Sequence, residues 1–381
     1  MSHSSQKKSF IAFLFVFLLI PLTLLPQERY FDASGASPDE IRLTIFYPSV
    51  GSLKALLELK KQGLLRVQNL KVIGVFHEKE RTDYEESIEF VQKNNIDWVK
   101  FHVLSGKIQR DNLFQKNPLT KDYEKIFKKS HGLIFFGGPD VPPYIYRLKT
   151  NLLTRIEDPY RNFSEISFIY HLLGGAQSKE RAPLLDSHPD FPILGICLGA
   201  QSLNVGTGGT LIQDIWSEIY GKFFLEDVFQ LGPTNWHINP WARFHPEQDL
   251  LPYSMHPIKL LRPGKFTDEL GFNEKDTPYI LSAHHQAVGK YGKDIEIIAT
   301  SLDGKVVEAI AHKRYTNVLG VQFHPEFPIL WDQTKTFKFT PKDKKEVSLK
   351  EILEAHLPSI EFHKKIWLWF CEKLEDCHQN K

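Results

Sequence analysis

The chain has 381 residues, of which 42% are hydrophobic and 24% charged, a composition ordinary for a globular protein with a large core. Its formal net charge of +1 excludes bulk charge as a basis for binding nucleic acid or an anionic membrane. Length alone allows one large domain or two small ones.

The chain opens with a basic and then an apolar segment. Lys7 and Lys8 precede an uncharged run, FIAFLFVFLLIPLTLL, at residues 10–25. This order predicts a signal peptide or a membrane anchor at residues 1–26, with the rest of the chain outside the cytoplasm. The run is somewhat short for a spanning helix, which needs roughly 17–25 residues. The nearest small-residue cleavage site, Ser34-Gly35-Ala36, lies well beyond it. Secreted, periplasmic and membrane-anchored forms therefore all stay open.

Residues 27–40 are predicted to form a polar linker, and residues 41–381 are assigned to one folded domain. Within it, apolar runs typical of buried strands alternate with amphipathic runs typical of helices. The strands are predicted at 41–48, 70–78, 96–104, 131–138 and 191–197. The helices are predicted at 52–65, 82–95, 119–130, 161–173 and from Leu198 onward. This alternation predicts an α/β fold whose central sheet is mostly parallel and covered by helices on both faces. In such sheets, binding sites form at the carboxyl ends of the strands.

The second half of the chain has a different character. Residues 216–263 are rich in Pro, Trp and His, show little periodicity and are interpreted as an excursion or lid. Antiparallel strands are predicted at 279–288, 295–312 and 318–327, with a hairpin turn at SLDGKV, residues 301–306. A charged loop at 340–351 then leads to an amphipathic helix at 359–374.

The chain has three cysteines, Cys197, Cys371 and Cys377. The last two lie on or just after the final predicted helix, where six residues rise about 9 Å. Bridged Cα atoms usually lie within about 7 Å of each other. No disulfide between them is expected, and Cys197 is an unpaired thiol.

Cys197 stands between a predicted strand and a predicted helix, in the sequence Gly195-Ile196-Cys197-Leu198-Gly199. This is the nucleophile-elbow pattern with sulfur in place of the serine oxygen. Glycines flank such a residue because the turn has no room for side chains. The helix N-terminus stabilises the thiolate, and its Leu198 N–H can bind a developing oxyanion. The alternative, a small buried apolar residue, is the commonest fate of a free cysteine, but it does not explain the two glycines.

Two other segments supply partners for such a nucleophile. In GVQFHPEF, His324 and Glu326 are two residues apart on a predicted strand, so they are expected on one face as base and orienting carboxylate. In LIFFGGPDVPP, Gly137 and Gly138 end a buried strand, and the Gly138 N–H is the second candidate oxyanion donor. Taken alone, each segment has an ordinary explanation, since a His-x-Glu pair is usually surface decoration and Gly-Pro-Asp is common in turns.

Together these motifs resemble the class I glutamine amidotransferase-like superfamily, and within it the gamma-glutamyl hydrolases, including the bacterial gamma-glutamyl-gamma-aminobutyrate hydrolases. The resemblance rests on GICLGAQSLNVGTGGTLIQDI, GGPD, HHQAV and GVQFHPE in that order, and spans residues 41–327. It implies a flavodoxin-like α/β sandwich with a small antiparallel extension, and a thioester mechanism.

The resemblance also assigns roles to single residues. It makes Cys197 the nucleophile, His324 the base and Glu326 its acidic partner, with Gly138 and Leu198 as oxyanion donors. Further residues are candidates for contact with a small gamma-glutamyl substrate: Gly137, Asp140, Gln201, His284, His285 and Gln286. No cofactor, metal or nucleic acid is expected.

Two segments depart from the family pattern. Residues 174–190 look like an insertion before the nucleophile strand, and residues 235–253 do not match the expected sequence there. Because both segments are expected to border the site, the leaving group of the substrate is not identified. Polyamine derivatives, folate polyglutamates, glutathione-like peptides and cell-wall peptides are all candidates.

Two other functions are weighed against a gamma-glutamyl hydrolase. An ammonia-supplying glutaminase subunit is disfavoured because no synthetase domain is attached and the chain is expected to be exported. An inactive, anchored binding protein of the same fold is disfavoured by the intact Cys–His–Glu set.

Overall fold

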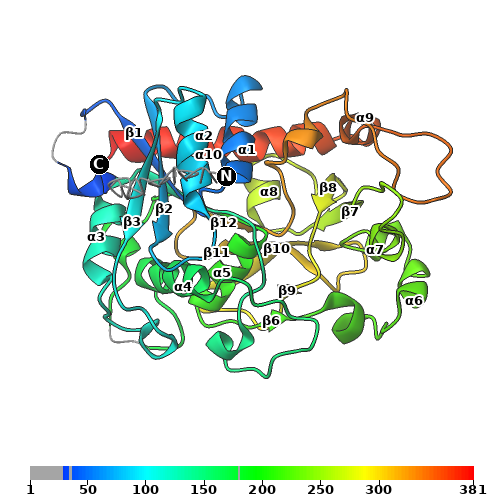
Figure 1. Cartoon of the computed structure of the whole chain (residues 1–381), viewed down its shortest axis with the longest axis horizontal. Helices are drawn as coiled ribbons and strands as arrows, with labels where there is room; N and C mark the ends of the chain where they lie inside the picture. Colours follow the sequence, from blue (N-terminus) through cyan, green and yellow to red (C-terminus); the bar gives the residue numbers. More distant parts are fainter. Residues whose placement is uncertain (1–28, 34–36, 179–180) are drawn as a thin grey trace, which may run out of the picture.

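The computed structural model describes residues 29–33, 37–178 and 181–381 (Figure 1). The predicted signal or anchor segment and the candidate cleavage site at 34–36 lie outside these residues. Within the described ranges, no helix combines the length and the apolar character needed to cross a membrane. Part of the predicted linker packs against the domain, because Phe31 is buried and its backbone N–H donates to His102 Nδ1 at 3.2 Å.

The main sheet has ten strands in the order β3-β2-β1-β4-β5-β12-β11-β10-β7-β8. The first six are parallel to one another, and β11, β10, β7 and β8 extend the sheet with antiparallel pairing. The strands are β1 (Ile41–Phe46), β2 (Leu70–His77), β3 (Val99–Leu104), β4 (Gly132–Phe135), β5 (Ile193–Ile196), β7 (Ser254–Leu260), β8 (Tyr279–Ser282), β10 (Ile295–Ser301), β11 (Val307–His312) and β12 (Val318–Val321). A second, two-stranded sheet pairs β6 (Leu211–Ile212) with β9 (Ala287–Val288). The predicted mostly parallel sheet with an antiparallel extension is confirmed.

Several helices, including α1 and α2, begin at a residue whose side chain caps the backbone. Ser49 accepts the Ser52 N–H before α1, and Asp83 accepts the Glu85 N–H before α2. The helices are α1 (Val50–Lys61), α2 (Tyr84–Lys93), α3 (Thr120–Lys129), α4 (Pro159–Leu173), α5 (Leu198–Gly206), α6 (Leu225–Phe229), α7 (Pro240–Phe244), α8 (Lys265–Asp268), α9 (Leu349–Ala355) and α10 (Ser359–Gln379).

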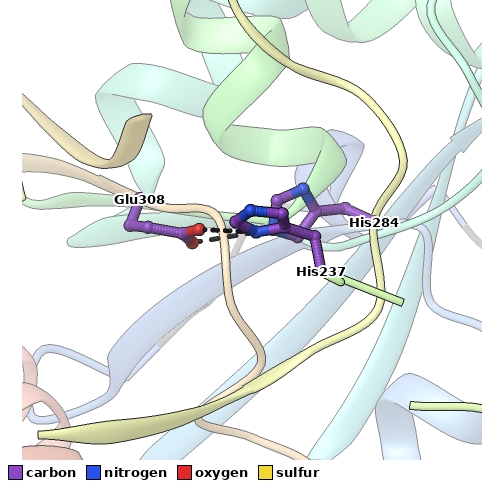
Figure 2. Close-up of side chains that lie close together, drawn as sticks. All are labelled: His237, His284 and Glu308. Atoms are coloured by element: carbon purple, nitrogen blue, oxygen red, sulfur yellow. Dashed lines mark ion pairs between the residues drawn. The ribbon is translucent and has the colours of Figure 1, made fainter. Parts of the chain in front are cut away.

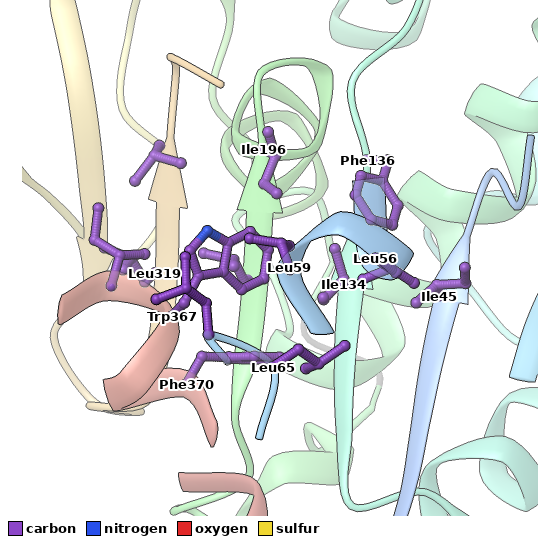
Figure 3. Close-up of a cluster of buried hydrophobic side chains, with 14 of the residues drawn as sticks. Ile45, Leu56, Leu59, Leu65, Ile134, Phe136, Ile196, Leu319, Trp367 and Phe370 are labelled. Carbon is purple, nitrogen blue, oxygen red and sulfur yellow. The ribbon is translucent and has the colours of Figure 1, made fainter. Parts of the chain in front are cut away.

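Helices cover both faces of the parallel part of the sheet. In β4, Ile134 packs into one core cluster, whereas Leu133 and Phe135 pack into another. Successive strand side chains point to opposite faces, so a continuous apolar run is what a strand buried on both faces needs. The first cluster includes residues of α1, α2 and α10, and Figure 3 shows Trp367 and Phe370 of α10 in it. The second cluster includes residues of α3, α4 and α5.

The structure corrects several boundaries. The predicted excursion at 216–263 contains a strand of the main sheet, β7, besides α6 and α7. Its remaining part is held by a small separate cluster that includes Trp216 and Trp236. The predicted charged loop at 340–351 includes the beginning of α9. All three cysteines are free, as expected, and Cys371 and Cys377 both lie inside α10.

Candidate active site

Three neighbouring strands deliver the candidate catalytic segments to one edge of the sheet. β4, β5 and β12 are adjacent and parallel, with Phe135 beside Gly195 and Ile196 beside Val321. Their carboxyl ends lead directly to Gly137-Gly138, Cys197 and His324. Segments almost 190 residues apart in the sequence therefore converge on one point because parallel strands end on the same side of a sheet.

Cys197 occupies a sharp turn between β5 and α5. Its φ of 52° lies in the left-handed region, which non-glycine residues adopt rarely and mostly at functional sites. The flanking glycines are required by space. A Cβ on Gly199 would lie 2.0 Å from the Phe135 carbonyl oxygen, and one on Gly195 would lie 2.7 Å from the Gly199 backbone. The sequence pattern thus reflects an elbow that presents the thiol at the N-terminus of α5.

His324 links the thiol to a carboxylate. Its Nδ1 lies 2.8 Å from Glu326 Oε1, and Cys197 is close enough to interact electrostatically with the ring. Burial alone would lower the pKa of His324, but Glu326 and Cys197 outweigh that effect and raise the pKa to about 10. The ring is therefore an imidazolium at neutral pH.

The expectation that His324 and Glu326 share a strand is wrong in detail. β12 ends at Val321, and both residues lie in the turns that follow. The pair forms nevertheless, because the turn brings the carboxylate back to the ring.

The Gly137-Gly138 loop rests on a buried arginine that the sequence analysis did not single out. Arg161, in α4, donates from Nη2 to the carbonyl oxygens of Phe136 at 2.7 Å and Gly137 at 3.1 Å. Its Nε donates to Glu165 Oε1 at 2.7 Å. A trans peptide directs its N–H opposite to its C=O, so the Gly138 N–H points away from Arg161. An arginine in a predicted amphipathic helix is usually expected to face solvent, and no pattern in the sequence indicates that Arg161 is buried.

Glycine is also required at both loop positions. A Cβ on Gly138 would lie 1.9 Å from Arg161 Nη1, and one on Gly137 would lie 2.9 Å from His324 Cε1 and 3.3 Å from Cys197 Cβ. The loop backbone therefore packs directly against Cys197 and His324. This close approach is the one that an oxyanion donor needs.

Two clefts adjoin this loop. One, of about 450 Å³, is lined by His324, Glu326 and both loop glycines, together with α1 residues such as Lys54. The other, of about 650 Å³, is lined by Asp140, His285 and Asp214 and by two arginines, Arg155 and Arg243. The second cleft thus offers groups of both charges next to Pro139 and Asp140, which directly follow the glycine loop.

Two predicted substrate residues in this second cleft bind each other. His285 Nε2 lies 3.1 Å from both carboxylate oxygens of Asp140, and its Nδ1 lies 3.4 Å from Asp214 Oδ2. Burial would lower the pKa of His285, but its hydrogen bonds to Asp140 and Asp214 prevail and raise the pKa to about 9. The ring is a cation held between two carboxylates at neutral pH.

This cluster predicts a pH-dependent contribution to stability. A pKa raised from 6.5 to about 9 stabilises the fold fully below about pH 6.5 and is lost as the pH rises through 9. The shift corresponds to a contribution on the order of 3 kcal/mol. We expect His285→Gln to lower the melting temperature clearly at pH 6 and far less at pH 10, measured by circular dichroism. His356→Gln, at a surface histidine, is the control. A difference in melting temperature between wild type and His285→Gln that stays the same at pH 6 and pH 10 would contradict the raised pKa of His285.

The other predicted substrate residues lie deeper. The Gln201 side chain is buried and donates to the Gln286 carbonyl at 3.3 Å and to Gln322 Oε1 at 3.2 Å. Gln322 in turn donates to Cys197 Sγ at 3.7 Å. His284 directs Nδ1 to the Gln286 carbonyl at 2.9 Å, and its Nε2 lies 3.6 Å from Glu308. Their direct contact with a substrate stays a prediction, since these side chains face protein groups around the nucleophile.

Comparison with known proteins agrees with this geometry. The family model described as Peptidase C26 matches residues 71–326. The chain is 31% identical over 211 residues to the glutamine amidotransferase-like protein YvdE of Lactococcus lactis, covering 55% of this chain and 71% of that protein. It is also 31% identical over 214 residues to a glutamine amidotransferase-like protein of Rickettsia prowazekii, covering 51% and 70% of the two chains. The chloroplastic anthranilate synthase beta subunit 1 of Oryza sativa is 25% identical over 150 residues, or 38% of each chain.

Proposed function

Because this chain belongs to the Peptidase C26 family, and is an enzyme of the cysteine hydrolase or amidotransferase-like type, we propose that it hydrolyses gamma-glutamyl amide bonds through a thioester on Cys197. The observation that carries the proposal is the contact of three segments at one point. These are the strained elbow cysteine, the His324–Glu326 pair at 2.8 Å, and a glycine loop with no room for a Cβ.

The proposed reaction has two halves. The Cys197 thiolate attacks the amide carbonyl, and His324 protonates the leaving nitrogen. The freed imidazole then takes a proton from water, which attacks the thioester and releases glutamate. The N–H groups of Gly138 and Leu198 bind the tetrahedral oxyanion, which contributes about 3–4 kcal/mol per donor in well-studied enzymes. Arg161 holds the Gly138 peptide in the required direction.

The 650 Å³ cleft is the proposed place of the glutamyl α-carbon. A gamma-glutamyl group carries an ammonium and a carboxylate, and this cleft presents Asp140 and Asp214, which also hold the His285 cation, together with Arg155 and Arg243. Side chains of both charges suit a zwitterion better than a neutral peptide.

The direct test is a hydrolysis screen with paired substrates. Gamma-glutamyl and alpha-glutamyl amides of the same amine are offered to the full chain, and release of the amine is followed. We expect turnover of the gamma-linked member only. Equal turnover of both, or of the alpha-linked member alone, would contradict the proposed specificity while leaving the cysteine chemistry in place.

A second candidate is an ammonia-supplying glutaminase, favoured by the similarity to anthranilate synthase beta subunits. Free glutamine as substrate separates the two. A hydrolase of gamma-glutamyl amides should release larger amines without a partner, whereas a glutaminase subunit should prefer glutamine and depend on its synthetase.

We also propose that the catalytic domain lies outside the cytoplasm. The motive is the order of Lys7-Lys8 and the uncharged run at 10–25. Alkaline phosphatase fused after Lys381 is expected to be active, whereas β-galactosidase at the same position is not. Deletion of residues 1–26 is the control and should reverse the pattern. Activity of the β-galactosidase fusion alone would contradict export.

A further inference from the structure

A cluster of histidines and one glutamate lies in the interior behind the nucleophile. His237 belongs to the segment before β7, His256 to β7, His284 to the turn after β8, and Glu308 to β11. All four are buried, with exposed fractions between 0% and 3%. His237 Nδ1 lies 3.1 Å and His256 Nε2 3.8 Å from Glu308 Oε1, and His284 Nε2 lies 3.6 Å from Glu308 Oε2. Figure 2 shows His237 and His284 directed at the carboxylate from two separate segments.

These polar atoms have no hydrogen-bond partner of acceptable geometry. The unpartnered atoms are both carboxylate oxygens of Glu308, both ring nitrogens of His237, and Nε2 of His256 and His284. A buried polar atom without a partner costs about 1–3 kcal/mol, so a cluster of them in one place requires an explanation.

The tautomers of two of the rings are fixed by backbone carbonyls. His284 Nδ1 lies 2.9 Å from the Gln286 oxygen, and His256 Nδ1 lies 3.2 Å from the Pro257 oxygen. A carbonyl oxygen only accepts, so each Nδ1 must donate its hydrogen. In a neutral ring, the form that burial favours, Nε2 then carries a lone pair. Both lone pairs are on the side of Glu308, and an arrangement of lone pairs around a carboxylate is complementary to a cation.

The backbone at His237 supports a specific role for its ring. Its φ of 58° is in the left-handed region, which costs free energy for a residue other than glycine. The residue is held there by its own carbonyl, which accepts the Ser282 hydroxyl at 2.6 Å and the His284 N–H at 3.2 Å. These bonds fix His237 beside His284 and aim its ring into the cluster.

We propose that His237, His284 and Glu308 bind a divalent transition-metal ion, with zinc as the best fit and His256 as the fourth ligand. One ligand atom of each of the first three residues lies within 4.8 Å of the others. Zinc–nitrogen bonds of about 2.0–2.1 Å in a tetrahedron need ligand atoms about 3.3 Å apart, so the three ligand atoms must approach one another by up to about 1.5 Å. His256, whose Nε2 is 3.8 Å from Glu308 Oε1, lies outside this set of three and must move in to complete the site. A set dominated by imidazole suits zinc rather than magnesium or calcium. Hydrogen bonds from Nδ1 to backbone carbonyls are the usual support of metal-binding histidines.

The proposed role is structural, and it differs from the expectation that the chain needs no metal. A closed, fully buried set of four protein ligands leaves no position for a substrate. The ion would tie the segment before β7 to the sheet beside the nucleophile. The Glu308 carbonyl accepts the Gln322 N–H at 2.8 Å, and the Gln322 side chain contacts Cys197 Sγ at 3.7 Å. Gln322 therefore connects Glu308 of the proposed metal site to the Cys197 thiol.

Metal analysis of the full chain tests the proposal independently of any substrate. The protein is purified without metal-affinity resin and is dialysed first against zinc chloride and then against zinc-free buffer. Its zinc content is then measured by inductively coupled plasma mass spectrometry. We expect equimolar zinc in the wild type, none in Glu308→Gln or His237→Gln, and equimolar zinc in His363→Gln, which replaces another fully buried histidine. Circular dichroism of each variant shows whether it is folded.

Cobalt(II) binding to the wild type keeps the test decisive if the cluster variants fail to fold. Exchange of zinc for cobalt should give the strong visible bands of a tetrahedral site without a sulfur charge-transfer band. Folded wild-type protein that retains no zinc and gives no such spectrum would overturn the proposal and leave a protonated histidine paired with Glu308. Equimolar zinc in folded Glu308→Gln would overturn it as well.

Discussion

Replacing Cys197 with alanine is expected to abolish turnover of gamma-glutamyl amides, with a loss of about 10⁶-fold in kcat, whereas Glu326→Gln should lose about 10⁴-fold. The Cys197 thiolate forms the thioester, and an alanine side chain has no group that could take its place. The carboxylate only orients His324 and stabilises its cation, and the glutamine can still accept a hydrogen bond across the same 2.8 Å contact. Steady-state rates of both variants with the best substrate of the screen measure the difference.

The covalent step is checked on the same protein. Enzyme quenched during turnover should carry a glutamyl group on the peptide that contains Cys197, as seen by mass spectrometry. Cys377→Ala, at a free cysteine in α10, is the control and should keep both activity and adduct. Undiminished turnover in Cys197→Ala would refute the thioester mechanism, and a wild-type rate in Glu326→Gln would remove that residue from the triad.

The second large effect is expected at Gly199, where an added methyl group has no space. Its Cβ would lie 2.0 Å from the Phe135 carbonyl oxygen, which is backbone and cannot swing away as a side chain could. Gly199→Ala must therefore separate β4 from α5, at a cost of roughly 3 kcal/mol or more. The same shift moves the Gly137-Gly138 loop from the thiol, so activity should fall together with stability.

Urea unfolding followed by circular dichroism measures this cost. Gly51→Ala in α1 is the matched control, because the nearest atom to its added Cβ is 3.6 Å away, an ordinary contact. We expect that control to change stability by about 1 kcal/mol or less. A Gly199→Ala protein as stable and as active as wild type would show that β4 and α5 do not pack as closely as the structure has them.

Local patterns were sufficient for the elements that are buried on both faces. β1 to β5 follow from continuous apolar runs, because a strand between two helical layers has no polar face, and α2 follows from the amphipathic run at 82–95. The elbow could be recognised from Gly195 to Gly199 because glycines around a cysteine between a strand and a helix are a short local pattern, although the contact that excludes a Cβ at Gly199 comes from Phe135 in β4. Cys197, His324 and the Gly137-Gly138 loop were likewise named from short motifs.

Contacts between residues from distant segments could not be predicted from such local patterns. The strand order places β4, β5 and β12 side by side, and only that order brings the three motifs into contact. β7 was missed inside the excursion because its pattern carries Pro257 and a short apolar run, and it is a strand through its pairing with β8 and β10.

The sequence by itself predicted the strands and helices of the parallel part of the sheet, the candidate nucleophile and its candidate base, since those depend on spacing along the chain. Only the tertiary structure decided that Arg161 lies under the glycine loop and that His285 sits between Asp140 and Asp214. It alone placed His237 and Glu308 within 3.1 Å. The physical reason is that burial and charge pairing belong to the neighbours a side chain acquires on folding, and those neighbours come from segments that no local pattern connects.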